Sequence, residues 1–137
     1  MISFCLITNR RCQTRFIRYY DELPQDPTAF ELNIARECII RKPAHALFVQ
    51  VGKYKIVYRV YASLYFIFGY ERDENEFAIL ELIQNCVEAL DVYFEKVTEL
   101  DILCNIEKVH MIMEETVAKG YCLETNQARI LEGVTAL

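Results

Sequence analysis

The chain has 137 residues and a formal net charge of −5, from 15 lysine and arginine against 20 aspartate and glutamate residues. This balance argues against a nucleic-acid binder held by phosphate contacts and against a generally basic membrane-binding surface. Hydrophobic residues make up 53% of the chain, which is typical of one globular domain over residues 1–137 and, at this size, favours a buried interface.

The cysteines form no C-x-x-C pair, and we expect them to act as small hydrophobic residues in a reducing cytosol. His45 and His110 are isolated, so we expect no zinc site and no cofactor. The apolar residues 1–8 are too few for a signal peptide, and no apolar run approaches the ~20 residues of a membrane span. The protein should therefore be cytosolic and reach membranes only through partners. The six cysteines are Cys5, Cys12, Cys38, Cys86, Cys104 and Cys122.

The N-terminal third predicts a hairpin followed by a helix. Residues 1–8 and 13–20 alternate as strands, and Asn9 between them suits a left-handed turn position. The pair at residues 26–27, aspartate then proline, predicts a helix start, and Pro43 should end that helix. Its inward face is expected to carry Phe30, Ile34, Cys38 and Ile40.

A second group of strands is expected at residues 47–51, 54–61 and 64–70. Asp73 and Glu76 then have the spacing of an N-cap and its N3 partner, which predicts the start of a long helix. A surface helix needs an apolar arc of only about 100°, and this helix has far more. We expect one flank to cover the sheet and the other to be covered by another protein. The polar stripe of this helix consists of Glu81, Gln84, Glu88, Asp91 and Glu95.

The remaining chain predicts further helices. Thr98 and Asp101 repeat the capping spacing, and Gly120 should end that helix in a left-handed cap. Thr125 is expected to cap a last short helix through Leu131. The order β-β-α-β-β-β-α-α-α predicts a single α+β domain with a five-stranded antiparallel sheet flanked by helices. The inward face after Asp101 is expected to use Ile102, Leu103, Ile106, Val109, Met113 and Val117.

No catalytic constellation is apparent. The four glycines form neither a G-x-x-x-x-G-K nor a G-x-G-x-x-G loop. Acidic residues three or four apart on the long helix are expected on any exposed face, so we interpret them as solvated. A nucleophile formed by Cys104 and His110 has no supporting context. We therefore expect a binding or scaffold module rather than an enzyme.

Residues 56–59 (Ile-Val-Tyr-Arg) and 64–66 (Leu-Tyr-Phe) resemble the signature of the small (sigma) chains of clathrin-adaptor-type complexes. The resemblance covers nearly the whole chain. Residues 123–131 look most like the sigma chain of the fourth, non-clathrin, trans-Golgi adaptor type. Further segments that match in family order are 9–10, 14–15, 85–94, 99–101, 105, 108–109 and 124–126.

The resemblance implies a longin-like fold and a place in a heterotetramer with two large chains and one medium chain. The small chain of this family packs into the solenoid trunk of one large chain, which would cover the over-apolar helix. Such complexes sort transmembrane cargo into coated vesicles or pits at the trans-Golgi network, endosomes or plasma membrane. Endocytosis is one of the transport processes that they serve. The resemblance also implies that the chain contacts membranes only as part of the complex.

The family's small chain also helps to bind acidic dileucine signals in cargo tails, in which an acidic residue precedes two bulky aliphatic residues. Burying each leucine side chain contributes roughly 1.5–3 kcal/mol, and the acidic residue needs a cation. By resemblance, the acidic residue would lie near Arg15. Lys96 stands where members that bind the signal often carry asparagine, and residues 12–13 (Cys-Gln) replace a frequent Gly-Lys. The apolar pocket would be formed by Ala62, Leu64, Val87, Val97, Leu100 and Ile102.

Alternative interpretations stand beside these expectations. Each apolar pocket residue could be plain core, and Arg15 could be a surface arginine with a local ion pair. The chain could also be a longin module of another trafficking complex, such as a tethering subunit or a fusion regulator. A longin fusion protein would need a heptad-bearing segment after the domain, and this sequence shows none before Leu137.

Overall fold

The computed structural model describes residues 2–41, 48–72 and 74–125, with side chains described to residue 120. All neighbouring strands pair antiparallel in the order β2-β1-β5-β4-β3. This confirms the predicted α+β fold with a five-stranded antiparallel sheet. The elements are β1 (Ile2–Asn9), β2 (Thr14–Tyr19), α1 (Pro27–Ile39), β3 (Phe48–Val51), β4 (Tyr54–Tyr61), β5 (Leu64–Tyr70), α2 (Glu76–Phe94), α3 (Glu99–Cys104) and α4 (Ile106–Thr125).

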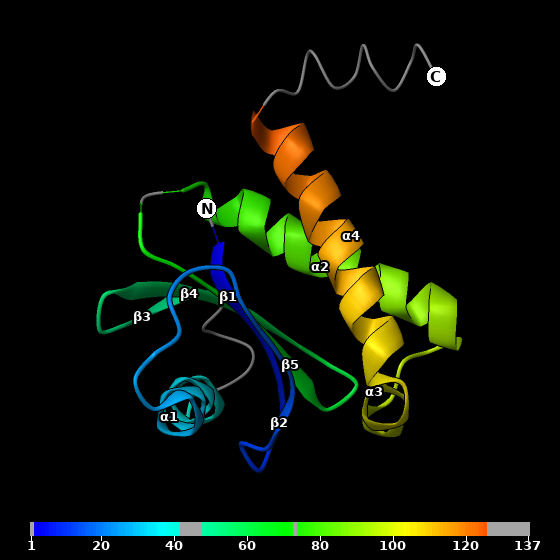
Figure 1. The fold of residues 1–137 in the computed structure, drawn as a ribbon, viewed down its shortest axis with the longest axis horizontal. Coiled ribbons are helices and arrows are strands. Elements are labelled where there is room, and N and C mark those ends of the chain that lie inside the picture. The colour runs from blue at the N-terminus through cyan, green and yellow to red at the C-terminus, as the bar shows by residue number, and fades with distance from the viewer. Residues whose placement is uncertain (1, 42–47, 73, 126–137) are drawn as a thin grey trace.

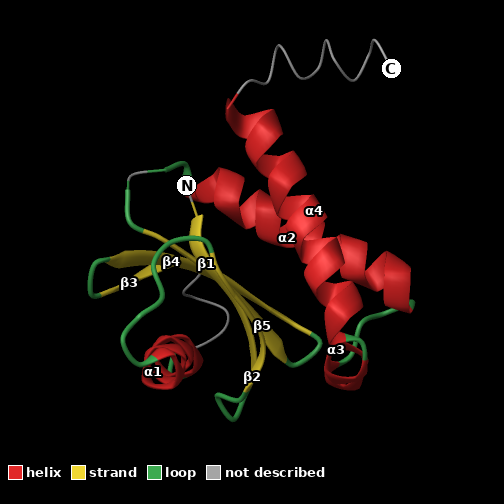
Figure 2. Cartoon of the chain, viewed as in Figure 1, coloured by secondary structure: helices red, strands yellow, loops and turns green. Residues whose placement is uncertain are grey.

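The sheet is sandwiched between two helical layers, with α1 on one face and α2 and α4 on the other (Figures 1 and 2). The larger apolar cluster lies under α2 and α4 and includes Phe66 and Phe68 of β5. The smaller cluster lies under α1 and includes Ile67 of β5. Every residue of β5 is buried, because this central strand is covered on both faces.

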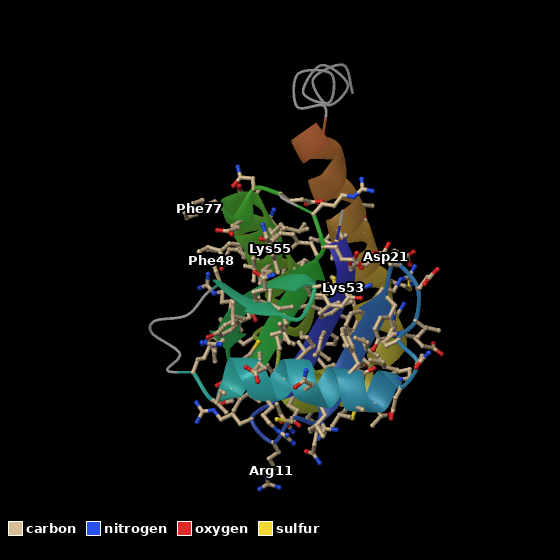
Figure 3. All side chains as sticks on the ribbon, turned by 90° about the vertical axis from the view of Figure 1, so that its left-hand side faces the viewer. Arg11, Asp21, Phe48, Lys53, Lys55 and Phe77 are labelled. Carbon is tan, nitrogen blue, oxygen red and sulfur yellow. The ribbon has the colours of Figure 1, made fainter. Side chains whose placement is uncertain are left out.

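The second flank of α2 is covered partly by α4 of the same chain, which crosses it (Figure 1). The expectation that another protein alone covers this flank is therefore too strong. Three large side chains of α2 still face solvent: Phe77 is 71% exposed, Val92 82% and Tyr93 52%. Phe77 packs edge-on against Phe48 of β3, with ring centroids 5.8 Å apart, and both rings lie at one side of the molecule (Figure 3).

The start of α2 differs from the prediction by two residues. Asn75 is the N-cap, and its side chain accepts hydrogen bonds from the backbone N–H groups of Phe77 and Ala78. Asp73, the predicted cap, lies outside the described residues. Asparagine is as good an N-cap as aspartate, so two candidate caps within three residues could not be ranked from sequence.

The predicted helix after Thr98 is two helices, and the Thr98–Asp101 capping box that starts α3 is confirmed. Asn105 separates them, with φ −131° and ψ 40°. Leu103 and Ile106 near this break are exposed, contrary to the expected inward face, while the other four predicted inward residues are buried. A single helical period across residues 98–119 therefore placed two side chains wrongly.

Gly120 does not end α4, which continues to Thr125. A Cβ atom at Gly120 would lie 2.3 Å from Cδ1 of Leu82, so this glycine allows α4 to cross α2 closely. Thr125 is the last described residue, and the predicted short helix through Leu131 lies outside the described part of the chain.

The start of α1 is confirmed, with the Asp26 side chain accepting a hydrogen bond of 3.2 Å from the N–H of Ala29. Ile34 and Cys38 are buried as expected and Phe30 packs against their cluster. Ile40 follows the last turn and is exposed, which corrects its predicted inward position. Pro43 lies outside the described residues.

The cysteines divide between the core and the surface. Cys5, Cys38 and Cys86 are buried free thiols, as expected of small hydrophobic residues. Burial raises the pKa of Cys38 and of Cys86 to about 12. Cys104, the last residue of α3, is an exposed free thiol. Cys122 lies beyond the described side chains.

Candidate functional site

Three segments that are far apart in the sequence meet at one end of the sheet, which we call the Leu64 end. Leu64 pairs with Asn9 of β1 and with Tyr61 of β4, so the β1–β2 turn and the β4–β5 turn lie together. Asn9 Nδ2 donates a 2.9 Å hydrogen bond to Glu99 Oε2, which brings the start of α3 to the same place. Figure 1 shows both turns and α3 along the lower edge of the view.

Four of the six predicted pocket residues come together in the cluster under α2 and α4. They are fully buried in this structure, with exposed fractions of 0–1%. The other two lie at the surface: Ala62 is exposed in the β4–β5 turn, and Leu100 on α3 is 67% exposed. The geometry therefore gathers the predicted residues at one end of the molecule, partly as core and partly as rim. The four buried residues are Leu64, Val87, Val97 and Ile102.

Arg15 lies at the same end and forms an ion pair, as the alternative interpretation allowed, but its partner Glu99 is distant in sequence and was not predicted. Its Nε donates to Glu99 Oε2 at 2.7 Å, and its Nη2 donates to Gln13 Oε1 at 3.0 Å. Asn9 Nδ2 donates to the same two acceptors, at 2.9 Å to Glu99 and 2.8 Å to Gln13. The hydrogen bonds from Asn9 and Arg15 hold the pKa of Glu99 below its ordinary value.

Asn9 organises the β1–β2 turn through its side chain rather than through a left-handed backbone. Its Oδ1 accepts hydrogen bonds from the N–H groups of Arg11, at 2.9 Å, and Gln13, at 3.0 Å. The left-handed position of this turn belongs to Cys12, with φ 62°. The sequence indicated that Asn9 lies in a turn, but it did not indicate that the Asn9 side chain also holds Glu99.

Asp91 is also a positioning residue, contrary to its interpretation as part of a solvated stripe. Its Oδ1 accepts a 2.9 Å hydrogen bond from the N–H of Val97, and its Oδ2 accepts one from the hydroxyl of Tyr61. It thereby ties the end of α2 to β4 and fixes the backbone of a predicted pocket residue. A signal was present: an acidic residue in the last turn of a helix opposes the helix dipole and needs a specific partner.

Backbone strain is concentrated around this end of the molecule. In the described residues, non-glycine positions with positive φ occur in the β1–β2 turn, the β4–β5 turn and the α2–α3 turn. Such conformations are disfavoured for residues with a Cβ, and they gather at functional sites. Lys96, with φ 78°, occupies a position where asparagine would be tolerated better. The positions are Cys12, Ala62, Ser63, Glu95 and Lys96.

Two hollows lie elsewhere on the molecule. One of about 620 Å³ lies near the opposite end of β1, lined by Ser3, Lys53 and Glu71 among others. The other, of about 530 Å³, is a shallow groove between α2 and α4 that includes Val92 and Tyr93. Neither contains a predicted pocket residue, and in the described residues no group of three His, Cys, Asp or Glu side chains could hold a metal ion.

Comparison with known proteins agrees with this architecture. The chain matches the family described as clathrin adaptor complex small chain over residues 1–137. It is 42% identical to the human AP-4 complex subunit sigma-1 over 132 residues, covering 96% of this chain and 92% of that protein. It is 45% identical to the Arabidopsis thaliana AP-4 complex subunit sigma over 134 residues, covering 97% and 94%.

A structural comparison supports the same assignment. The structure described as a homology model of the full-length AP-3 complex in a stretched open conformation contains a chain that matches with a TM-score of 0.68 and 25% identity, covering 94% of this chain and 99% of that one. None of the described helices is long and apolar enough to cross a bilayer. Fold, full-length similarity and the resemblance found in the sequence agree, and the chain belongs to the clathrin adaptor complex small-chain family.

Proposed function

We propose that the chain is the small subunit of a heterotetrameric vesicle-coat adaptor complex of the fourth type. The observation that carries this proposal is the 42–45% identity to AP-4 sigma subunits of three organisms over nearly their whole length. Its role is assembly and binding rather than catalysis. As one domain over residues 1–137, it stabilises the core formed by two large chains and one medium chain, and it reaches the cytosolic face of trans-Golgi or endosomal membranes within that complex.

The exposed apolar side chains support a surface that a partner covers. Val92 and Tyr93 near the end of α2 face solvent, and Met111 on α4 is also exposed. Burying a leucine or valine side chain in an interface contributes roughly 1.5–3 kcal/mol. The solenoid trunk of a large adaptor chain is the expected partner.

Co-purification tests the assembly. A tagged chain expressed in its own cells should isolate two large chains and one medium chain in equal amounts. Recovery of tethering or fusion-regulating subunits instead would favour the alternative, a longin module of another trafficking complex. A durable monomer without any such companion would contradict both assignments.

We further propose that the Leu64 end contributes to binding of acidic dileucine signals. The pocket is formed by the six residues given above, and Arg15 receives the acidic residue of the signal. The clustering of all seven residues at one end supports this site. Four of them are buried in the free chain, so binding of the two leucines requires the pocket to open at the exposed edge formed by Leu100 and Ala62. We propose that assembly of the complex opens it.

Leu100 offers a cleaner test of the pocket than the buried residues do. Leu100→Ser should weaken binding of an acidic dileucine peptide to the assembled complex about tenfold, because part of a leucine contact worth roughly 1.5–3 kcal/mol is lost. Leu103→Ser is the matched control, since Leu103 is also exposed on α3 but is not a predicted pocket residue. Equal affinities for both variants and wild type, measured by fluorescence anisotropy, would show that the pocket is misplaced.

A further inference from the structure

The cation proposed for the signal's acidic residue already holds a carboxylate of the same chain. Arg15 Nε lies 2.7 Å from Glu99 Oε2, and Gln13 occupies Nη2 at 3.0 Å. Arg15 is the less exposed partner of this pair, with a side chain that is 20% exposed against 37% for Glu99. The pair is therefore partly shielded from water, which strengthens it relative to a fully exposed ion pair.

Glu99 is held by more than its charge. It is the first residue of α3, directly after the Thr98 N-cap, and the Thr98–Asp101 capping box fixes the backbone there. Asn9 donates a second hydrogen bond to the oxygen that Arg15 contacts. The carboxylate thus sits at a defined place beside the guanidinium, unlike a mobile surface side chain that meets an arginine by chance.

We propose that Glu99 is an internal competitor for Arg15, and that it sets how strongly the acidic residue of a sorting signal contributes to binding. This inference rests on the proposed function, in which Arg15 receives that acidic residue. Glu99 is a specificity-determining residue that does not itself contact the two leucines of the signal.

The direction of the effect follows from the charges. A guanidinium has five N–H donors, so an incoming carboxylate can displace Glu99 or bind at donors beside it. In the first case the new ion pair replaces an existing one, and in the second case two carboxylates repel each other across a short distance. Both arrangements reduce the gain from an acidic residue, whereas a neutral glutamine, which offers Arg15 only an uncharged carbonyl oxygen, is affected far less.

A second pair on the same strand provides a matched control. Arg18 Nη2 lies 2.9 Å from Glu114 Oε1, so it too joins β2 to a C-terminal helix. Its side chains are more exposed, at 39% and 58%, and it lies toward α4, away from Leu64. Glu114→Gln therefore removes one negative charge and one Arg–Glu pair without touching the proposed site.

The experiment measures affinities of two peptides for the assembled complex by fluorescence anisotropy. One peptide carries an acidic dileucine signal, and the other has glutamine in place of the acidic residue. Glu99→Gln should bind the acidic peptide about two- to fivefold more tightly, the range expected when an exposed ion pair no longer competes. Its affinity for the glutamine peptide should change by much less than its affinity for the acidic peptide, and Glu114→Gln should change neither affinity.

Three results would overturn the inference. Weaker binding of the acidic peptide to Glu99→Gln would mean that Glu99 orients Arg15 instead of competing for it. Equal strengthening for both peptides would mean that Glu99 acts by restraining α3. Unchanged affinity for the acidic peptide would show that Glu99 has no influence. If the wild-type and Glu99→Gln complexes both leave the acidic peptide unbound, the proposed cargo function itself fails, which is a separate outcome.

Discussion

The two faces of the sheet are covered to different depths. On one face α1, with 13 residues, buries Ile34, Ala35 and Cys38, and partly buried aromatic rings complete the rim. On the other face α2 and α4, with 19 and 20 residues, close a larger cluster. All four buried candidate pocket residues belong to this second cluster. Changes on the α1 face should therefore alter stability without altering the proposed binding site, whereas changes under α2 alter both.

The largest effect is expected for a charge placed under α2. Val87 is fully buried, and Val87→Asp would place a carboxylate in the apolar cluster without a partner. An unpaired buried charge is among the few causes of very large destabilisation, and we expect a loss of at least about 4 kcal/mol. The measurement is the yield of soluble chain and the urea midpoint of unfolding.

The neighbouring residue provides the control for this variant. Glu88 is exposed, so Glu88→Gln should leave the yield and the urea midpoint unchanged. If Val87→Asp folds and assembles like Glu88→Gln, then Val87 lies in a site that water can reach rather than in core, and the contrast between buried and rim pocket residues is lost.

A steric change on the opposite face should have a smaller effect. A Cβ atom at Gly69 would lie 2.2 Å from Cε1 of Phe4, whose ring is buried between Phe30 and Tyr54. Gly69→Ala must therefore push a packed ring aside, and we expect a loss of about 2–3 kcal/mol in the free energy of unfolding. Urea titration followed by circular dichroism measures it.

Gly52→Ala separates this steric effect from backbone strain. Gly52 has φ +59° but no atom within 4 Å of its Cβ position, so only the conformational penalty of about 1 kcal/mol should appear. The folded Gly69→Ala chain should still bind cargo peptide in the assembled complex with wild-type affinity. A cost for Gly69→Ala no larger than that for Gly52→Ala would mean that Phe4 repacks freely and that the α1 face is not tightly packed.

Features that depend on local contacts could be predicted from the sequence, whereas features that depend on contacts between distant elements could not. The order and type of most elements along the chain followed from residue periodicity, and the start of α1 and of α3 followed from capping residues whose hydrogen bonds are local. The role of Gly120 was not accessible in this way. A glycine near a helix end normally predicts a cap, but this one is selected by the close approach of Leu82 from another helix.

The candidate site shows the same limit. The positions of Leu64 and Arg15 came from a resemblance, because a single leucine or arginine carries no signal of its own. The contacts of Glu99 with Arg15 and of Asp91 with Tyr61 span 84 and 30 residues. Such pairs depend on which turns the tertiary fold brings together, so neither local propensity nor periodicity can indicate them.

The smallest expected effect is a difference in cysteine reactivity, which reports on how readily α1 and α2 open away from the sheet. Cys38 lies on the buried face of α1 and Cys86 on the buried face of α2, and burial raises the pKa of each thiol to about 12. At pH 8 both thiols are protonated and shielded from solvent. Each therefore reacts with iodoacetamide only when the helix that carries it opens away from the sheet. Exposed Cys104 is the internal reference and should be labelled first. Peptide mass spectrometry over time should then give the order Cys104, Cys38, Cys86.

The order of the two buried thiols is the informative part. A 13-residue helix that buries three side chains should open more readily than a helix clamped by a second long helix, because less apolar area is exposed on opening. Raising the pH from 8 to 9 should speed labelling of Cys38 and Cys86 alike, since the thiolate fraction of an opened chain rises with pH. Labelling of Cys86 before Cys38 would contradict this expectation. The helical layer over the candidate pocket would then be the less stable of the two, and the pocket could open to cargo without help from a partner chain.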